Sequence, residues 1–271
     1  MARRRLDAEL VRRGLAASPT EARSAVAGGL VMVAGRPADN PATLVDPAEP
    51  VELTRPQDPF VSRGGRKLDA ALDRFGVDVS GRRALDAGAS TGGFTDVLLR
   101  HGAAHVIAVD VGYGQLAWSL RTDARVTVLE RTNVRDLKPR ALPFEPEIVV
   151  ADLSFVSLRG VVPTLVDLAA PGADLVLLVK PQFEAGRDRV GAGGVIRDAE
   201  AWRDALDGVA DALRGSGAEP LAAMASPVRG PAGNVEFPLH ARRGAEPRSF
   251  DATGAVAEAE RRTADGSGAR A

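Results

Sequence analysis

The first part of the chain alternates apolar and polar residues with the spacing of short helices and strands. Apolar residues at helical intervals predict one helix over residues 6–13 and a second that is capped by Ser18 or Thr20. Apolar runs at 30–33 and 51–53 predict two strands, each bounded by glycine- or proline-containing turns. The pattern indicates a small α+β module.

From about residue 60 onward, apolar runs alternate with amphipathic stretches. The amphipathic stretches predict helices at 94–99 and 202–213. The apolar runs predict strands at 83–86, 106–110, 126–129, 148–152 and 175–179. Near-continuous apolar strands separated by helices are typical of a parallel sheet with helices on both faces. We therefore predict an α/β, Rossmann-like fold for this part of the chain.

Changes in composition suggest where the domains begin and end. Residues 1–55 form the predicted N-terminal module, and the polar, proline-containing segment 56–62 is the predicted linker. The α/β domain is expected at 63–244. The region 245–271 is rich in Ala, Glu, Arg and Gly, and we expect a short helix near 255–261 followed by a frayed tail.

Overall composition narrows the possible functions. The chain has 271 residues, 45% of them hydrophobic, and a net charge of −1, so nucleic-acid binding would depend on local basic patches. Cysteine is absent and the three histidines are scattered, so no metal site is expected. No apolar run approaches the ~18 residues of a membrane helix, and none follows the basic start of the chain. A cytoplasmic, monomeric protein is expected.

Lysine is rare in a chain that otherwise uses arginine. Of 35 basic residues, only Lys67, Lys138 and Lys180 are lysine. Arginine stays protonated in proteins, whereas a buried lysine can lose its proton and act as a base. Lys180 ends the last predicted strand and Lys67 opens an amphipathic stretch, so both are candidates for chemistry. Lys138 precedes a proline in a polar loop and is expected to be solvated.

A glycine-rich turn at residues 85–94 joins the first strand of the α/β domain to the next helix. Small residues in such a turn let the backbone approach a ligand closely. Asp86 precedes the first glycine, where it can order the turn or meet a ligand cation, and the Gly-x-Gly-x-x-Gly spacing of pyrophosphate sites is missing. Both details favour S-adenosylmethionine. Asp110 ends the next strand and is placed for a ribose diol, which suits S-adenosylmethionine or a nicotinamide cofactor.

Several segments of the chain occur in the order that is typical of one family. They are Arg5 to Val31, Ser62 to Leu68, Asp86 to Thr95, Asp110 to Leu116, Asp152 to Phe155, Val179 to Glu184 and Gly233 to Glu236. On these segments the chain resembles the TlyA family of rRNA methyltransferases over about residues 3–240. The resemblance implies an S4-like RNA-binding domain joined to an FtsJ-like, S-adenosylmethionine-dependent methyltransferase domain.

The resemblance also implies the site. It places a Lys-Asp-Lys-Glu catalytic tetrad of ribose 2′-O-methylation at Lys67, Asp152, Lys180 and Glu236. The implied cofactor is S-adenosylmethionine, and the implied substrate is a cytidine ribose of ribosomal RNA, 16S or 23S or both, within ribosomal subunits. Cofactor contacts are expected at Asp86, Gly88, Ala89, Ser90, Thr91, Gly92, Gly93, Phe94, Asp110, Val111 and Asn133.

Arginines are the expected RNA contacts. Up to Arg36 the chain has seven arginines and three acids, a local charge of +4 that suits phosphate binding. The expected contacts are Arg3, Arg4, Arg5, Arg23, Arg63, Arg66, Arg131 and Arg135. Pro19 and Asn40 depart from the family's pattern in the N-terminal module. Tyr113 and Trp118 are expected to pack beside the cofactor loop.

The tetrad suits methyl transfer because a 2′-hydroxyl is a poor nucleophile until its proton is removed or shared. Lys180, at the carboxyl end of a parallel strand, is the predicted base. Lys67 would oppose the protonation of Lys180, whereas Asp152 and Glu236 would favour it. Asp152 is expected to orient Lys180 and the hydroxyl, and Glu236 to fix Lys67 or the ribose.

Other interpretations remain open at this point. Asp152 could cap a helix, Lys67 could be a solvated residue of a first helical turn, and Glu236 could lie on an exposed strand. The alternative functions are a catalytically silent RNA-binding or ribosome-assembly factor, a nicotinamide-dependent oxidoreductase and a haemolysin. The filled tetrad argues against the silent factor, and the lack of a leader or membrane segment argues against the haemolysin.

Overall fold

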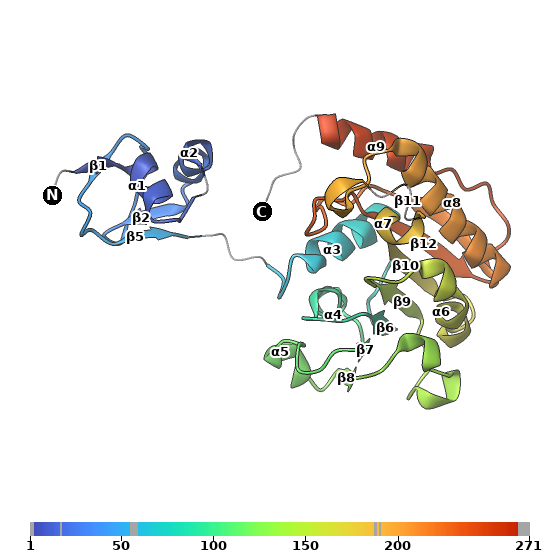
Figure 1. The fold of residues 1–271 in the computed structure, drawn as a ribbon. Coiled ribbons are helices and arrows are strands. Elements are labelled where there is room, and N and C mark those ends of the chain that lie inside the picture. Colours follow the sequence, from blue (N-terminus) through green and yellow to red (C-terminus); the bar gives the residue numbers. More distant parts are fainter. Residues whose placement is uncertain (1–2, 17, 55–58, 187–188, 190, 265–271) are drawn as a thin grey trace. The chain divides into compact units, whose positions relative to one another are not determined.

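A computed structural model describes residues 3–16, 18–54, 59–186, 189 and 191–264. The chain divides into two compact units, Met1–Pro59 and Phe60–Ala271, which are described separately below (Figure 1). Residues 56–58 of the expected linker 56–62 lie outside the described residues. Among the described residues, no helix combines the length and apolar character that crossing a bilayer requires.

The N-terminal unit packs two helices against small antiparallel sheets. Its elements are β1 (Arg4–Arg5), α1 (Leu6–Arg12), α2 (Pro19–Ala27), β2 (Val31–Val33), β3 (Arg36–Pro37), β4 (Leu44–Val45) and β5 (Val51–Leu53). Strands β3, β2 and β5 form one sheet, and β1 pairs with β4. Ser18 caps α2 by accepting from the backbone N–H of Glu21 at 3.2 Å, and Pro19 occupies the first turn, a position that needs no N–H donor. The predicted α+β module is confirmed.

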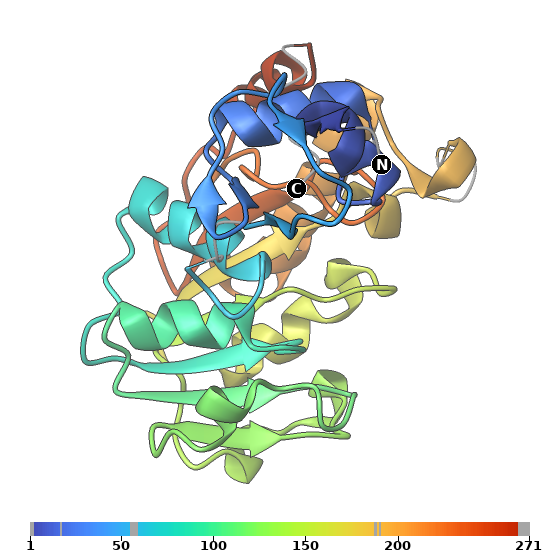
Figure 2. The same cartoon turned by 90° about the vertical axis from the view of Figure 1, so that its left-hand side faces the viewer.

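The second unit contains a seven-stranded sheet in the order β11-β12-β10-β9-β6-β7-β8 (Figures 1 and 2). The strands are β6 (Arg83–Ala87), β7 (His105–Val109), β8 (Val126–Leu129), β9 (Ile148–Ala151), β10 (Asp174–Val179), β11 (Ala218–Ala223) and β12 (Phe237–Arg243). The five strands from β6 to β10 are parallel, as predicted. The parallel arrangement ends beyond β10, where β12 pairs antiparallel with both β10 and β11 and makes the sheet mixed.

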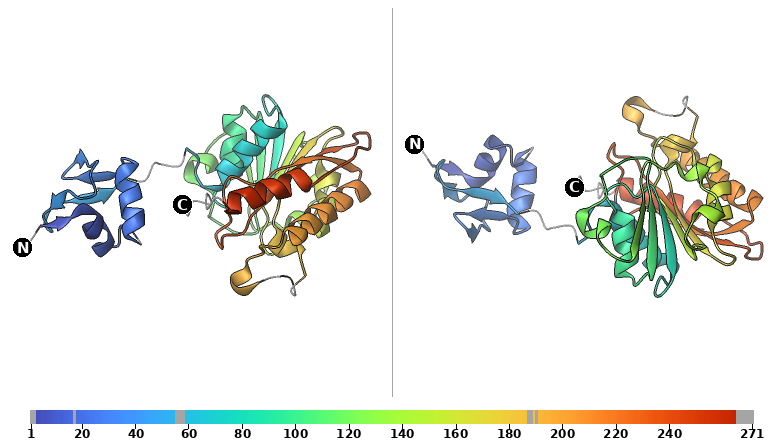
Figure 3. Two further views of the ribbon diagram at one scale, coloured as in Figure 1. Left: turned by 90° about the horizontal axis from the view of Figure 1, so that it is seen from above. Right: turned by 90° about the horizontal axis from the view of Figure 1, so that it is seen from below.

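Helices cover both faces of this sheet (Figure 3). They are α3 (Gly64–Phe75), α4 (Gly93–Arg100), α5 (Trp118–Arg121), α6 (Val162–Leu168), α7 (Pro181–Glu184), α8 (Ala199–Gly215) and α9 (Thr253–Ala264). Side chains of a strand alternate between its two faces. Accordingly, Val150 packs in one core with α3 and α4, whereas Val149 packs in the other with α6, α8 and α9. The predicted Rossmann-like layering is confirmed.

The strand ends bring the candidate residues to one edge of the sheet. Four neighbouring parallel strands, β10, β9, β6 and β7, end at the same edge of the sheet. The residues that follow them in the chain are, in that order, Lys180, Asp152, Gly88 and Asp110. Ligands of open α/β sheets bind at this carboxyl edge. The fold therefore gathers four expected site residues on one side of the sheet.

Candidate active site

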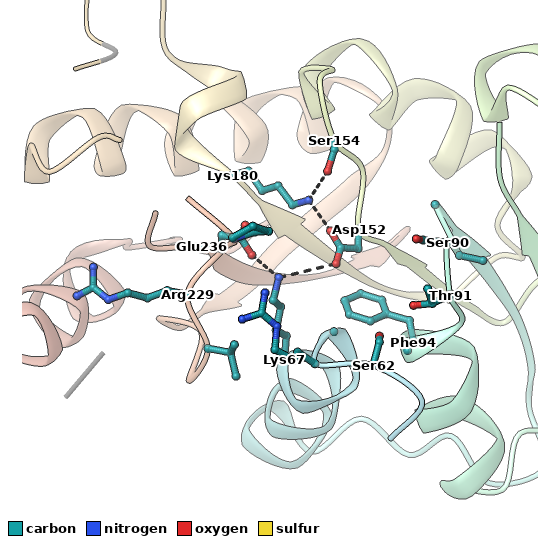
Figure 4. Close-up of a pocket in the computed structure, with 17 residues that line it drawn as sticks. Ser62, Lys67, Ser90, Thr91, Phe94, Asp152, Ser154, Lys180, Arg229 and Glu236 are labelled. Carbon is teal, nitrogen blue, oxygen red and sulfur yellow. Dashed lines mark hydrogen bonds and ion pairs between the residues drawn. The ribbon is translucent and has the colours of Figure 1, made fainter. Parts of the chain in front are cut away.

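Asp152 lies between two lysines at the carboxyl edge of the sheet (Figure 4). The Nζ of Lys180 is 2.6 Å from Oδ1 of Asp152, and it also donates to Oγ of Ser154 at 2.8 Å. The Nζ of Lys67 is 3.9 Å from Oδ2 of Asp152 and donates to Oε2 of Glu236 at 2.5 Å. The structure thus brings the four expected tetrad residues into one connected cluster.

The cluster is largely withdrawn from water. Lys67 and Lys180 are each 7% exposed and Glu236 is 1% exposed, whereas the side chain of Asp152 retains 21%. Lysine and glutamate are rarely buried unless they are paired, and here each has a partner of opposite charge. The interpretations of Lys67 as a solvated lysine and of Glu236 as an exposed strand residue are therefore wrong.

Asp152 caps no helix among the described residues. The short 3₁₀ turn at Leu158–Gly160 begins after Ser157, and α6 begins after Val161. The carboxylate of Asp152 instead faces the two lysines. That side chain is therefore available for chemistry and has no capping role.

Two cavities meet at Asp152. The first, of about 290 Å³, is lined by Ser62, Arg63, Gly64, Lys67, Gly88, Ala89, Ser90, Thr91, Gly93, Phe94, Asp152, Ser154, Lys180, Val228, Arg229, Pro231 and Glu236. The second, of about 530 Å³, is lined by Gly88, Ser90, Val109, Asp110, Val111, Gln115, Thr132, Asn133, Val134, Arg135, Asp152, Leu153, Ser154, Phe155, Val156 and Val161. We call them the tetrad cavity and the Asp110 cavity. Gly88, Ser90, Asp152 and Ser154 line both.

The glycine-rich turn is shaped by close backbone approach. Gly88 has φ of +88°, and a Cβ there would lie 2.7 Å from the carbonyl oxygen of Asp152. A Cβ at Gly93 would overlap Oγ of Ser62, where α3 and α4 begin side by side. These glycines let the turn, the strand end that carries Asp152 and the start of α3 come together around the tetrad cavity.

Asp110 lines the second cavity, and backbone hydrogen bonds fix its carboxylate there. Its Oδ2 accepts from the backbone N–H of Ser90 at 2.8 Å, and its Oδ1 accepts from the backbone N–H of Gly112 at 2.6 Å. An ionised carboxylate can accept about four hydrogen bonds, so both oxygens can still bind a ligand hydroxyl. Apolar side chains of Val109, Val111 and Val134 line the same cavity. A carboxylate beside apolar walls fits a nucleoside with its ribose diol.

Asp86 lies behind the turn and lines neither of these two cavities. It is fully buried, and its Oδ2 accepts from Oγ1 of Thr95 in α4 at 2.7 Å. Burial raises the pKa of Asp86 to about 7, helped by the negative charges of Asp152 and Asp110. Its Oδ1 has no hydrogen-bond partner among the described residues. Asp86 therefore supports the turn from behind through its bond to Thr95, outside the linings of the two cavities.

The other expected cofactor residues divide between the two cavities. Ala89, Thr91, Gly93 and Phe94 line the tetrad cavity, Asp110, Val111 and Asn133 line the Asp110 cavity, and Gly88 and Ser90 line both. Gly92, with φ of +100°, lines neither of these two and packs against Leu120 and Leu116. Among the described residues, no group of three His, Cys, Asp or Glu side chains could hold a metal ion.

Sequence reasoning missed several residues of the site. Ser62, Ser154, Val228, Arg229 and Pro231 all line the tetrad cavity. Ser154 could have been found because it belongs to the same short segment as Asp152. The segment 228–231 gives no periodic signal, and it reaches the cavity only because its chain continues into Glu236 and β12.

The expected arginines have different environments. Arg63 lines the tetrad cavity and Arg135 the Asp110 cavity, whereas the guanidinium of Arg131 lies 4.3 Å from the ring centroid of Tyr113. Arg66 is exposed on α3. In the N-terminal unit, Arg3, Arg4 and Arg23 are exposed, and Arg5 binds Asp7 through two hydrogen bonds of 3.1 and 2.9 Å.

Two aromatic predictions are wrong. Tyr113 is 68% exposed and Trp118 is 75% exposed, so neither packs into the core beside the cofactor loop. The loop after β7 turns outward, and its buried contact is made by Leu116 and Leu120 instead. Lys138 is exposed, as predicted.

Comparisons with known proteins agree with this geometry. Residues 60–243 match the FtsJ-like methyltransferase family, and residues 4–51 match the S4 domain. The chain is 54% identical over 244 residues to the 16S/23S rRNA (cytidine-2′-O)-methyltransferase TlyA of Mycobacterium tuberculosis, covering 89% of this chain and 91% of that protein.

Two further similarities extend over most of the chain. It is 44% identical to the candidate rRNA methyltransferase YqxC of Bacillus subtilis, covering 87% of this chain and 84% of that protein. A solved structure of a candidate hemolysin from Streptococcus thermophilus superposes with a TM-score of 0.76 at 36% identity, covering 98% of both chains.

Proposed function

Since the chain belongs to the TlyA group of FtsJ-like methyltransferases, we propose that it methylates the 2′-hydroxyl of a cytidine ribose in ribosomal RNA, 16S or 23S or both. The cofactor of this family is S-adenosylmethionine, which supplies an activated methyl group on a sulfonium. One observation carries the proposal: the carboxylate of Asp152 contacts both buried lysines on a wall that two cavities share.

The two cavities suit two ligands. Asp110 and Asn133 would hold the nucleoside of the cofactor in the Asp110 cavity, among its apolar side chains. The acceptor ribose would enter the tetrad cavity, where Lys67 and Lys180 lie. Because Gly88 and Asp152 line both cavities, the donor and the acceptor would meet beside Asp152. Holding two reactants in this way lowers the barrier through positioning alone.

The residues of the tetrad then have separate tasks. Lys180, in its neutral form, takes the proton of the 2′-hydroxyl at Nζ. Asp152 orients Lys180 through the 2.6 Å contact and stabilises the ammonium that forms. Glu236 fixes Lys67 through the 2.5 Å contact, so that Lys67 keeps a positive charge near Asp152.

The arginines would hold the RNA. Exposed Arg3, Arg4 and Arg23 of the S4 domain suit phosphate contacts that fix the position of a folded RNA without reading its bases. Arg63 and Arg135 line the two cavities and would bind phosphates that flank the target nucleotide. Ribosomal subunits are the proposed form of the substrate.

Substitution of Lys180 tests the proposal. Lys180→Ala and Lys180→Arg are expected to lower methyl incorporation into unmodified small and large subunits by about 10²–10⁴-fold. Arginine fails because it keeps its proton. Calorimetry should show cofactor binding within a few fold of the original chain. The control is Lys138→Arg, at an exposed loop position, which should retain full activity. Full activity in Lys180→Ala would refute the assignment, and no methyl incorporation by the original chain into either subunit would refute the substrate.

A further inference from the structure

The distance between Asp152 and Lys180 is not set by the sheet alone. The paired register of β9 and β10 ends at Ala151 opposite Leu177, and both catalytic side chains lie beyond it. Asp152 begins a loop that leads into the 3₁₀ turn at Leu158, and Lys180 is the residue before the short helix α7. The backbone N–H of Asp152 is still held by the carbonyl of Ala87 in β6 at 3.1 Å, and a contact between this loop and α7 adds a second restraint on the two side chains.

Glu184, the last residue of α7, supplies that contact. Its carboxylate is buried, with the residue 6% exposed. Its Oε1 accepts from the backbone N–H of Leu158 at 2.6 Å, and its Oε2 accepts from Oγ of Ser157 at 2.6 Å. Arg159 completes the junction, because its Nη2 donates to the backbone carbonyl of Glu184 at 2.6 Å and its Nε is 3.3 Å from Oε2.

The loop that Glu184 holds contains an unfavourable backbone conformation. Phe155 has φ of +63°, a left-handed conformation that is unfavourable for an L-residue, and its side chain is 91% exposed. Burial of the Phe155 side chain therefore does not offset the cost of this backbone conformation. Its ring lies 5.4 Å from that of Phe183 in α7. The loop is held on both sides of Phe155, because Lys180 donates to Ser154 before it and Glu184 accepts from Ser157 and Leu158 after it.

We propose that Glu184 is a positioning residue for methyl transfer: its buried carboxylate fastens the loop 152–158 to α7 and so maintains the 2.6 Å contact between Asp152 and Lys180. Glu184 lines neither the tetrad cavity nor the Asp110 cavity, so it acts through the loop and touches no substrate. The inference rests on the proposed role of Lys180.

The chain offers a matched control. Glu219 in β11 is also 6% exposed, and it also lies 3.3 Å from an arginine Nε, that of Arg214. It lines neither of those two cavities. Replacing either glutamate removes one buried, arginine-paired carboxylate, but only Glu184 also accepts from the loop, at Ser157 and Leu158. Only the substitution of Glu184 should change turnover.

The test measures kcat, KM for ribosomal subunits and cofactor affinity for Glu184→Gln, Glu184→Ala, Glu219→Gln and Glu219→Ala, beside Lys180→Ala. Glu184→Ala should lower kcat about 10–100-fold, because a displacement near 1 Å can cost 10²-fold. Glu184→Gln should lower it less, since one amide oxygen can still accept from Leu158. In both variants KM and cofactor affinity should stay within about threefold, and the Glu219 variants should keep the original kcat. Ser157→Ala, which removes a single hydrogen bond, should lower kcat several-fold if Glu184→Ala does not fold.

The outcomes separate the two proposals. If Lys180→Ala is inactive while Glu184→Gln and Ser157→Ala match the Glu219 variants in kcat, the positioning role of Glu184 is wrong and the proposed function stands. If Lys180→Ala remains active, the proposed function itself fails. If the Glu184 variants raise KM and leave kcat unchanged, the loop serves RNA binding, and the positioning role is again wrong.

Discussion

The ion pair of Lys67 and Glu236 gives a quantitative test of the buried cluster. The pair is 2.5 Å long between residues that are 7% and 1% exposed. Removing one partner of a buried pair costs about 3–5 kcal/mol, whereas replacing both with uncharged residues costs much less. Lys67 retains Asp152 at 3.9 Å, so Glu236→Gln should cost about 3 kcal/mol. Lys67→Met leaves a nearly inaccessible carboxylate without its lysine and should cost about 5 kcal/mol.

The double variant Lys67→Met with Glu236→Gln tests directly whether the two charges form a pair. It leaves neither charge of the pair buried and unpaired, so its cost should fall below that of Lys67→Met alone, and therefore well below the sum of the two single costs. Urea denaturation followed by tryptophan fluorescence measures these free energies. Both tryptophans, Trp118 and Trp202, belong to the second unit, so the signal reports that unit alone. Trp202 is 2% exposed and packs 5.9 Å from Phe237, the residue after Glu236.

A surface ion pair is the control. Arg125 and Asp123 are 2.7 Å apart, but their side chains are 47% and 24% exposed. Asp123→Asn should therefore cost less than about 1 kcal/mol. If Glu236→Gln and Lys67→Met are as mild as this control, or if their costs simply add in the double variant, the two charges do not form the buried pair on which the site depends.

Two further variants probe the glycine-rich turn. The pKa of Asp86 is about 7 in the fold, whereas its ordinary value is 3.8, so the folded state holds the proton more tightly than the unfolded state does. The stability of the original chain should therefore fall by up to about 4 kcal/mol as pH rises from 4 to 8, at about 1.4 kcal/mol per pKa unit. Asp86→Asn should abolish this part of the pH dependence in urea denaturation, and parallel profiles for the two proteins would contradict the raised pKa. Gly88→Ala places a Cβ 2.7 Å from the carbonyl oxygen of Asp152 at φ of +88° and should weaken cofactor binding at least about tenfold in calorimetry. Gly172→Ala, at φ of +76° with open space around the Cβ, should leave binding unchanged, and equal affinities of the two variants would refute the packing argument.

The sequence predicts those strands whose place in the fold follows from the hydrophobic pattern alone. Strands β9 and β10 are continuous apolar runs, and their parallel pairing follows from the helices between them. Strand β12 carries Pro238, His240 and Arg242 and looks unlike a buried strand. These polar side chains find partners, because Asp174 of β10 accepts from Nε2 of His240 at 2.9 Å and from Nε of Arg242 at 3.0 Å. Phe237, Leu239 and Ala241 alternate with these residues and are buried in the core, so the strand has a short period-2 pattern. Such a pattern names no partner strand and no direction, so the antiparallel place of β12 between β10 and β11 was not predicted.

The same distinction applies to the site. Asp110, Asp152 and Lys180 follow predicted parallel strands, so their convergence at one edge could be derived from topology. Lys67 is on a helix and Glu236 precedes an antiparallel strand, and only the family resemblance connected them to the others. Glu184 and Arg229 were not found as site residues. Their roles depend on contacts between loops, which the pattern of a single chain does not encode.

The balance of charge in the cluster explains why a lysine suits the proposed reaction better than an arginine. With both lysines protonated, Lys67, Lys180, Asp152 and Glu236 carry two positive and two negative charges and sum to zero. When Lys180 is neutral, the cluster has a net charge of −1 in a largely buried site. Taking a proton from the 2′-hydroxyl then restores neutrality, and the ammonium forms 2.6 Å from Asp152, where opposite charge stabilises it. An arginine at position 180 would keep the cluster neutral at all times and could not accept the proton. The partly exposed side chain of Asp152 and the exposed Ser154 leave a route by which the proton can return to water after each transfer.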